Sequence, residues 1–367
     1  MRERNLTIDA SRGVAIVLVV LGHSIMAAID YYARDLASLP RFLVNLDQVI
    51  YAFHMPLFIV LAGYVTWRPD PSPSGRFLAR RFMRLMVPYL SWLVGRAVVL
   101  WAISHRLGVR GLVAALLNPW SGGLWFFYAL FLCCVILAPL RRSPRLVAAS
   151  AIAVACFPHF GGVMPWTPGQ LVGLADSWLR VATVGGGLFD WRDVLWLYPF
   201  LAAGFLAAAY SEKVREYRRP IMMASAVAFP VLLVATWPIG FGSGGMGPWL
   251  HSLAGPGFAW LADYLLVLLR YPLALAGTVL CVALVSTLGR AAKSALAFLG
   301  VRSLGIFAVQ AQVLNLGWGT GSLGVVRVFL AAFGLSLGAT MVLERIPFAS
   351  DLLLGQPALR GGKPRPQ

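Results

Sequence analysis

The sequence predicts an all-α polytopic membrane protein with about ten transmembrane helices and both termini in the cytoplasm. The 367 residues are 59% hydrophobic and 12% charged, whereas a soluble domain has about a quarter of its residues charged. Apolar runs of about 20 residues, the length that crosses a bilayer, recur along the chain. The net charge of +17 comes from short basic clusters between these runs. That arrangement is typical of membrane topology, so we expect the lipid bilayer and no nucleic acid as a partner.

Ten apolar stretches are candidate spans, taken here in chain order. They cover roughly residues 10–29, 44–66, 85–104, 123–140, 145–163, 193–210, 219–239, 264–288, 300–317 and 323–343. With a cytoplasmic N-terminus, the inside segments hold 21 of the 31 Lys and Arg residues and the outside segments hold 6. Because positive charge is retained on the cytoplasmic side, this count favours an even number of spans with both ends in the cytoplasm. We expect the protein in the inner (cytoplasmic) membrane.

The chain is predicted to form one transmembrane domain over residues 1–345, followed by a basic, disordered tail over residues 346–367. We expect the first apolar run to stay as a signal anchor. The four cysteines lie in apolar runs without a CxxC pair or a histidine at metal spacing, so we expect free thiols and no metal site.

Two ionisable residues interrupt the first span, in the segment "RGVAIVLVVLGH" from Arg12 to His23. Over this separation an α-helix turns about 20° past three full turns and rises about 16 Å, so both side chains share one face. Ionisable groups within a span are costly and usually face a protein-lined cavity. The alternatives are an interfacial anchor for Arg12 and a hydrogen bond to a neighbouring helix for His23.

A second intramembrane histidine, His54, lies about ten residues into the second span, which runs in the opposite direction. It is therefore expected at the depth of His23, where two imidazoles could line one cavity. A structural hydrogen bond across helices is the alternative.

Three arginines, Arg80, Arg81 and Arg84, crowd the start of the third span in "RFLARRFMRLMVPYL". Guanidinium groups bind phosphates through charge-assisted, often bidentate hydrogen bonds. Anionic lipid headgroups are the competing ligand. A nucleotide-bearing cofactor docked here could extend an arm of roughly 15–20 Å toward His23, by the rise per residue of a helix. A neutral imidazole there could take the proton of a hydroxyl.

Four segments together resemble the membrane-bound acyltransferase-3 family, in particular its branch similar to fucose 4-O-acetylases. These are "IDASRGVAIVLVVLGHS", "YAFHMPLFIVLAGYV", "RRFMRLMVPYL" and "GGLWFFYALF". The resemblance is strong over the first four spans and rests on helix count beyond them. It implies transfer of an acyl group, usually acetyl, from acyl-CoA to a hydroxyl of a sugar in a polysaccharide, glycolipid or glycosylated natural product. Acyl-CoA would be a co-substrate, with no permanently bound cofactor.

The resemblance also implies roles for residues that match the family's motifs. Arg12 and His23 correspond to an essential pair, with His23 as the general base. Asp9 corresponds to a recurrent acid that can orient Arg12 from the same helix face. Arg81 and Arg84 correspond to a motif assigned to donor handling, and Arg80 adjoins them.

Three further positions match less distinctive parts of the family pattern. His54 and Trp125 are recurrent residues. Gln310 stands where a histidine is common in "LGVRSLGIFAVQAQVL". Glutamine can hydrogen-bond the substrate that accepts the acyl group, but it cannot take a proton. We therefore do not expect catalysis to depend on that position. The extra periplasmic esterase-like domain of many relatives is not expected here.

These features favour a membrane O-acyltransferase that transfers directly from donor to acceptor, with an acyl-His23 intermediate as a variant. The alternative is a transporter or flippase of an envelope glycan or lipid-linked precursor, since broken spans and midplane ionisable groups suit that class too. A structural subunit with inert histidines is the other alternative.

Overall fold

Helices are the only regular elements in the described part of the computed structural model, which confirms the all-α fold class. The structure describes residues 5–31, 41–104, 123–156, 191–236, 252–253, 259–314 and 322–356. The helices are α1 (Leu6–Tyr31), α2 (Arg41–Thr66), α3 (Ser74–Arg81), the π-helical turn η2 (Phe82–Met86), α4 (Val87–Ser104), α6 (Trp125–Leu140), α7 (Pro144–Cys156), α9 (Trp191–Ala209), α10 (Ser211–Glu216), α11 (Arg218–Ala235), α13 (Ala259–Thr287), α14 (Arg290–Val301), α15 (Ser303–Val313), α16 (Ser322–Leu343), α17 (Pro347–Ala349) and the π-helical turn η6 (Ser350–Leu354).

Five of these described helices are long and apolar enough to cross a membrane, namely α1, α2, α11, α13 and α16. The pair α14 and α15 adds a sixth if it is counted as one broken span. Three shorter apolar helices lie over Trp125–Leu140, Pro144–Cys156 and Val194–Ala209. Each of the ten predicted spans overlaps a helix, and the chain is a multi-pass membrane protein.

The helix α11 shows how the outer surface suits a bilayer. After Arg218 and Arg219, its exposed side chains are apolar and include Met223, Val227, Val231 and Val234. A patch of this kind is unfavourable in water. In lipid it is the surface that a spanning helix normally presents, because every backbone polar group is satisfied within the helix.

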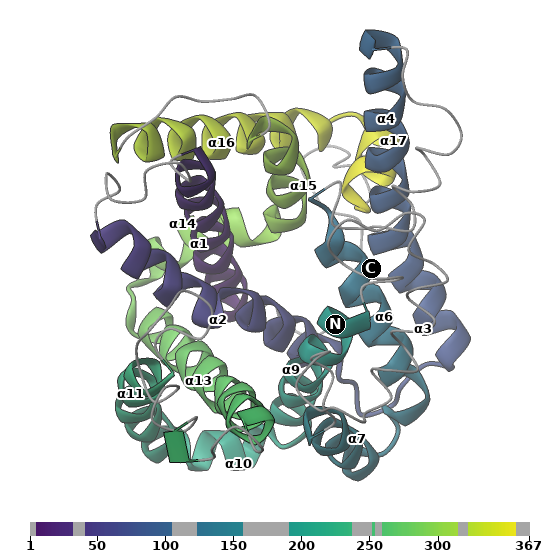
Figure 1. Cartoon of the computed structure of the whole chain (residues 1–367). Coiled ribbons are helices and arrows are strands. Elements are labelled where there is room, and N and C mark those ends of the chain that lie inside the picture. Colours follow the sequence, from purple (N-terminus) through teal and green to yellow (C-terminus); the bar gives the residue numbers. More distant parts are fainter. Residues whose placement is uncertain are drawn as a thin grey trace.

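The helix α1 lies at the centre of the bundle and contacts α2, α13, α14, α15 and α16. Figure 1 shows α14 and α15 beside it and α16 across one end. Glycines allow the closest approach, because a Cβ on Gly13 would overlap the Leu296 carbonyl and a Cβ on Gly300 would overlap that of Asp9. Small residues at such crossings are typical of membrane helices, which associate mainly through close packing.

The ninth predicted span, 300–317, differs from the structure. The chain is already helical from Arg290, and α14 and α15 meet at Arg302 with a bend of 62°. Arg302 stabilises this corner through an ion pair of 2.8 Å with Glu344 at the end of α16. The hydropathy pattern does not report the bend, because apolar residues continue through it.

The predicted disordered tail is also corrected for residues 346–356. Leu354 of η6 is buried, and Trp92 Nε1–H donates to the Leu353 carbonyl at 2.9 Å. Gly355, with φ of 59°, then lies against the backbone of Arg84, where a Cβ would overlap. These contacts attach the segment to α4 and η2 (Figure 1). Residues 357–367 lie outside the described residues.

Candidate active site

His23 of α1 and Gln310 of α15 meet in the interior of the bundle. Nδ1 of His23 lies 3.0 Å from Nε2 of Gln310. In this orientation the amide N–H donates and Nδ1 accepts, which requires an imidazole without a proton on Nδ1. Gln310 is fully buried, whereas His23 is partly exposed. His23 is therefore the more accessible residue of the pair, and the buried amide of Gln310 supports its ring.

The sequence left Gln310 able to hydrogen-bond the acceptor substrate but gave it no part in catalysis. The structure adds a contact that the sequence pattern did not indicate, because the amide lies on His23. The other amide atom, Oε1, is buried without a hydrogen-bond partner among the described residues. A rotation of the amide by half a turn would exchange the two atoms, so that Oε1 accepts a proton-bearing Nδ1.

His54 of α2 lies where that helix packs on the His23 region of α1, since a Cβ on Gly22 would contact the Tyr51 and Ile50 side chains. The ring is buried, and its Nδ1–H donates to the Ile50 carbonyl of the same helix at 2.8 Å. Tyr51 packs edge-on against it, with ring centroids 4.7 Å apart. The structure thus brings both histidines together, and its contacts favour a supporting role for His54.

Arg12 and Asp9 lie in the first turns of α1, where Nη1 of Arg12 is 3.8 Å from Oδ1 of Asp9. The helix continues unbroken from Leu6 to Tyr31. Arg12 and His23 are therefore held on one face about 16 Å apart, by the rise per residue of an α-helix.

The arginines of the third span surround the end of α2. Arg81 Nη2–H donates to Thr66 Oγ1 at 2.6 Å, and Arg80 Nη2–H donates to Ser72 Oγ at 2.7 Å. Arg84 lies in η2, and π-helical turns of this kind are frequent at functional sites. From Thr66 to His54 the helix rises about 18 Å, which matches the separation along α1. Both helices therefore place the histidines at a similar distance from a basic end.

Arg141, at the end of α6, belongs to the same basic cluster, although the sequence pattern did not single it out. Its guanidinium donates to the Ser72 carbonyl and stacks on the Phe77 ring, 4.3 Å from the centroid. Desolvation, followed by repulsion from Arg80, Arg142 and Arg81, lowers the pKa of Arg141. None of the described carboxylates pairs with Arg141 or its cluster neighbours Arg80 and Arg81, so the cluster is suited to an anionic ligand.

Trp125 begins α6 and packs edge-on against Phe126, with ring centroids 6.2 Å apart. Gly123, with φ of 68°, precedes it, and its backbone lies beside Ala311 of α15. Because Ala311 follows Gln310, the structure brings the start of α6 to the helix that supports His23. The contacts of Trp125 do not by themselves assign it a chemical role.

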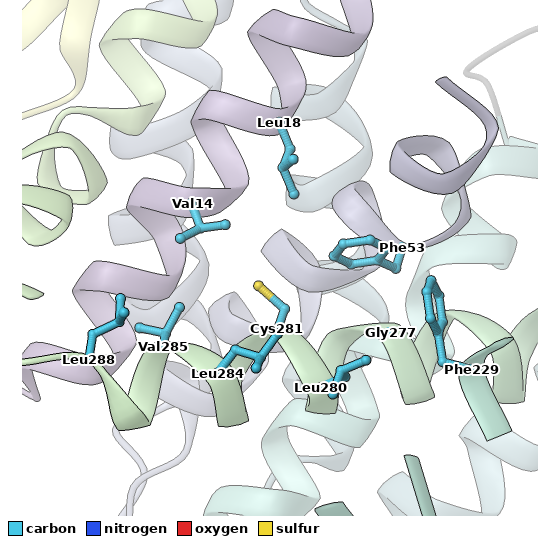
Figure 2. Close-up of a pocket in the computed structure, with 10 residues that line it drawn as sticks. All are labelled: Val14, Leu18, Phe53, Phe229, Gly277, Leu280, Cys281, Leu284, Val285 and Leu288. Atoms are coloured by element: carbon cyan, nitrogen blue, oxygen red, sulfur yellow. The ribbon is translucent and has the colours of Figure 1, made fainter. Parts of the chain in front are cut away.

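A groove of about 340 Å³ lies on another side of α1 (Figure 2). Its lining is apolar and includes Val14 and Leu18 of α1 together with residues of α2, α11 and α13. On a helical wheel these two residues lie about 200° and 240° from Arg12, whereas His23 lies about 20° from it. The groove therefore belongs to the opposite face of α1 from the candidate site.

Comparisons with known proteins give this chain relatives and a family. The chain is 27% identical over 225 residues to Nodulation protein NolL of Mesorhizobium japonicum, a match that covers 56% of this chain and 55% of the relative. It is 30% identical over 169 residues to Nodulation protein NolL of Sinorhizobium fredii, which covers 44% and 45%. The matched region thus spans about half the length of each relative. No solved structure matches the chain. The family model described as an acyltransferase domain covers residues 5–345, and the chain therefore belongs to the acyltransferase-3 family.

Proposed function

We propose that the protein is an integral membrane O-acyltransferase of the cytoplasmic membrane that moves an acyl group, acetyl in the simplest case, from acyl-CoA to a sugar hydroxyl. The observation that carries this proposal is the partly exposed His23, held by Gln310 about 16 Å along one helix face from Arg12. The acceptor is a carbohydrate or glycosylated compound.

The basic cluster is the proposed donor site. Arg12, Arg81 and Arg84 would bind the phosphates or the pantetheine arm of acyl-CoA at the end of α1 and α2 where the arginines gather. The arm would then follow the helices toward the histidines, a distance that both α1 and α2 set at about 16–18 Å. Asp9, beside Arg12, would fix the direction of that guanidinium.

His23 would act as the general base. The acceptor oxygen attacks the thioester carbonyl carbon while Nε2 of His23 takes the hydroxyl proton, and the carbon–sulfur bond breaks to release the thiolate of CoA. The imidazolium later returns the proton to the thiolate. This scheme uses the amide orientation in which Gln310 Oε1 accepts Nδ1–H, because Nε2 is then free of a proton. General-base catalysis of this kind contributes about 10²–10⁴ in rate.

A transporter or flippase remains the alternative, since a pair of intramembrane histidines in a multi-span bundle also suits a translocation path. Membership of the acyltransferase-3 family favours transfer chemistry. The two proposals differ in whether acyl-CoA is consumed.

Mass spectrometry of the source organism's glycans tests the proposal. A strain that lacks the gene is complemented with the wild-type chain, with His23→Gln or with Ser24→Ala. Ser24 is a matched control, because it adjoins His23 but its hydroxyl only donates to the Val20 carbonyl of its own helix. We expect an acyl mass increment with the wild type and Ser24→Ala and none with His23→Gln. An identical glycan profile with all three, and in the deletion strain, would contradict the proposed activity.

A further inference from the structure

Asp47 is a buried carboxylate in α2 that the proposed chemistry does not use. Only 4% of the residue is exposed. Its Oδ1 has no hydrogen-bond partner within the described part of the chain. An unpaired polar group in an apolar interior costs free energy. Packing alone does not explain why this position carries an acid rather than a leucine.

The helical register places Asp47 on the same side of α2 as the histidine site. Leu43, Asp47, Ile50 and His54 follow at intervals of four, three and four residues, which is one face of an α-helix. Leu43 and Ile50 form one buried cluster with Ile25 of α1 and with a residue of α16. Asp47 therefore lies between α1, α2 and α16, and Ile25 is only two residues beyond His23.

Asp47 and the basic cluster lie on opposite sides of the histidines. From His54, α2 rises about 18 Å to Thr66, which Arg81 contacts, and about 10 Å in the other direction to Asp47. If the acyl donor binds at the end of α2 that the arginines surround, the Asp47 end of α2 is open to the acceptor substrate. A ligand that reaches both His54 and Asp47 must extend over about two helical turns.

The chemistry of the group identifies the kind of ligand. An ionised carboxylate only accepts hydrogen bonds, and a protonated one retains acceptor capacity. A sugar offers several hydroxyl donors on one ring. Hydrogen bonds to a charged group are also stronger than those between neutral groups. An acyl donor, by contrast, is polyanionic and would be repelled.

We propose that Asp47 binds hydroxyl groups of the sugar acceptor and holds it on the side of His23 opposite the donor arginines. This inference rests on the proposed acyl transfer and adds an acceptor subsite to it. Asp47 is a binding residue in this account, and His23 remains the base.

The test uses purified full-length protein in lipid nanodiscs, acetyl-CoA labelled in its acetyl group, and a glycan extract from a strain of the source organism that lacks the gene. The variants are Asp47→Leu and Asp47→Asn, with Asn45→Leu as the control. Asn45 is a polar residue of the same helix end, but it is exposed. Label transfer is measured against extract concentration, alongside acetyl-CoA binding and thermal melting.

We expect Asp47→Leu to lower transfer at limiting extract by about tenfold or more, the range for a lost hydrogen bond to a charged group. Asp47→Asn keeps one oxygen acceptor and should lose less. The melting temperature of Asp47→Leu should stay the same or rise, because the substitution removes a buried acid whose Oδ1 has no partner among the described residues. Acetyl-CoA binding should persist in both variants, and Asn45→Leu should resemble the wild type.

Two results would overturn the inference. One is unchanged dependence on extract concentration in Asp47→Leu. The other is a lower melting temperature with all activity lost in proportion to unfolded protein, which would make Asp47 structural. Failure of the proposed function has a different signature, since wild-type protein would then transfer no label at any extract concentration.

Discussion

Substitution of Gly300 by alanine is expected to separate α14 from α1. A Cβ at Gly300 would lie 2.9 Å from the Asp9 carbonyl carbon and 2.9 Å from the Gly13 nitrogen, with the Asp9 oxygen nearer still. Carbon atoms pack best at about 3.5–4.0 Å, so α14 must retreat on the order of 1 Å. All three neighbouring atoms are backbone, and no side-chain rotation can relieve the overlap.

The displacement of α14 should also move Gln310, because α14 joins α15 directly at Arg302 and α15 carries Gln310. The hydrogen bond from Gln310 to His23 is 3.0 Å long, and a displacement on the order of 1 Å breaks it. Overpacking of this kind destabilises a protein by about 1–3 kcal/mol. Misplacement of a catalytic group by about 1 Å can reduce the rate by about 10²-fold.

Thermal melting in detergent and the rate of label transfer from acetyl-CoA measure the two effects. Gly338→Ala is the matched control, because Gly338 lies inside α16 and nothing approaches within 4 Å of a Cβ built there. Alanine also favours helix over glycine, so this control should melt at or above the wild-type temperature and remain active. If Gly300→Ala behaved like Gly338→Ala in both assays, the proposed coupling of α14 packing to the site would be refuted.

Three further substitutions test separate contacts. Gln310→Leu, nearly equal in volume, leaves Nδ1 of His23 without its partner, and we expect kcat to fall about tenfold while acetyl-CoA binding persists. A fall in binding alone would argue against a positioning role. Arg81→Leu should weaken acetyl-CoA binding by about 10- to 100-fold in a direct binding assay; equal affinity would place the phosphates elsewhere. Leu354→Ala should lower the free energy of unfolding by about 2–5 kcal/mol in a denaturation experiment, since the side chain is buried. The exposed Phe348→Ala is its control, and equal stability of the two variants would contradict the described packing of the C-terminal segment.

The sequence predicted those parts of the fold that depend on hydropathy and helical geometry. Apolar runs located the helices, and the spacing of Arg12 and His23 needs only an unbroken helix to be correct. The same reasoning predicted that His54 lies near His23. Both histidines are about as many residues from the membrane surface along their antiparallel spans, so they are expected at a similar depth in the bilayer. These features are local, or follow from the thickness of the bilayer.

Contacts between distant segments were beyond the reach of the sequence pattern. Gln310 is 287 residues from His23, and only the bend between α14 and α15 brings the two together. Arg141 joins the basic cluster by packing on Phe77, which no spacing rule reports. The sequence pattern also contains Asp47, an acid seven residues before a histidine in an apolar span. Its burial, with Oδ1 unpartnered among the described residues, is a property of the tertiary structure.

In the proposed mechanism, His23 takes the proton of a hydroxyl during acyl transfer. The direct test is single-turnover transfer of labelled acetyl from acetyl-CoA to the glycan extract by purified wild-type protein and by His23→Gln, at saturating donor. We expect labelled glycan with the wild type and a rate reduced by about 10²–10⁴ in His23→Gln, with acetyl-CoA still bound. Transfer by His23→Gln at the wild-type rate would contradict this mechanism, as would a labelled acetyl group that accumulates on His23 before any glycan is modified.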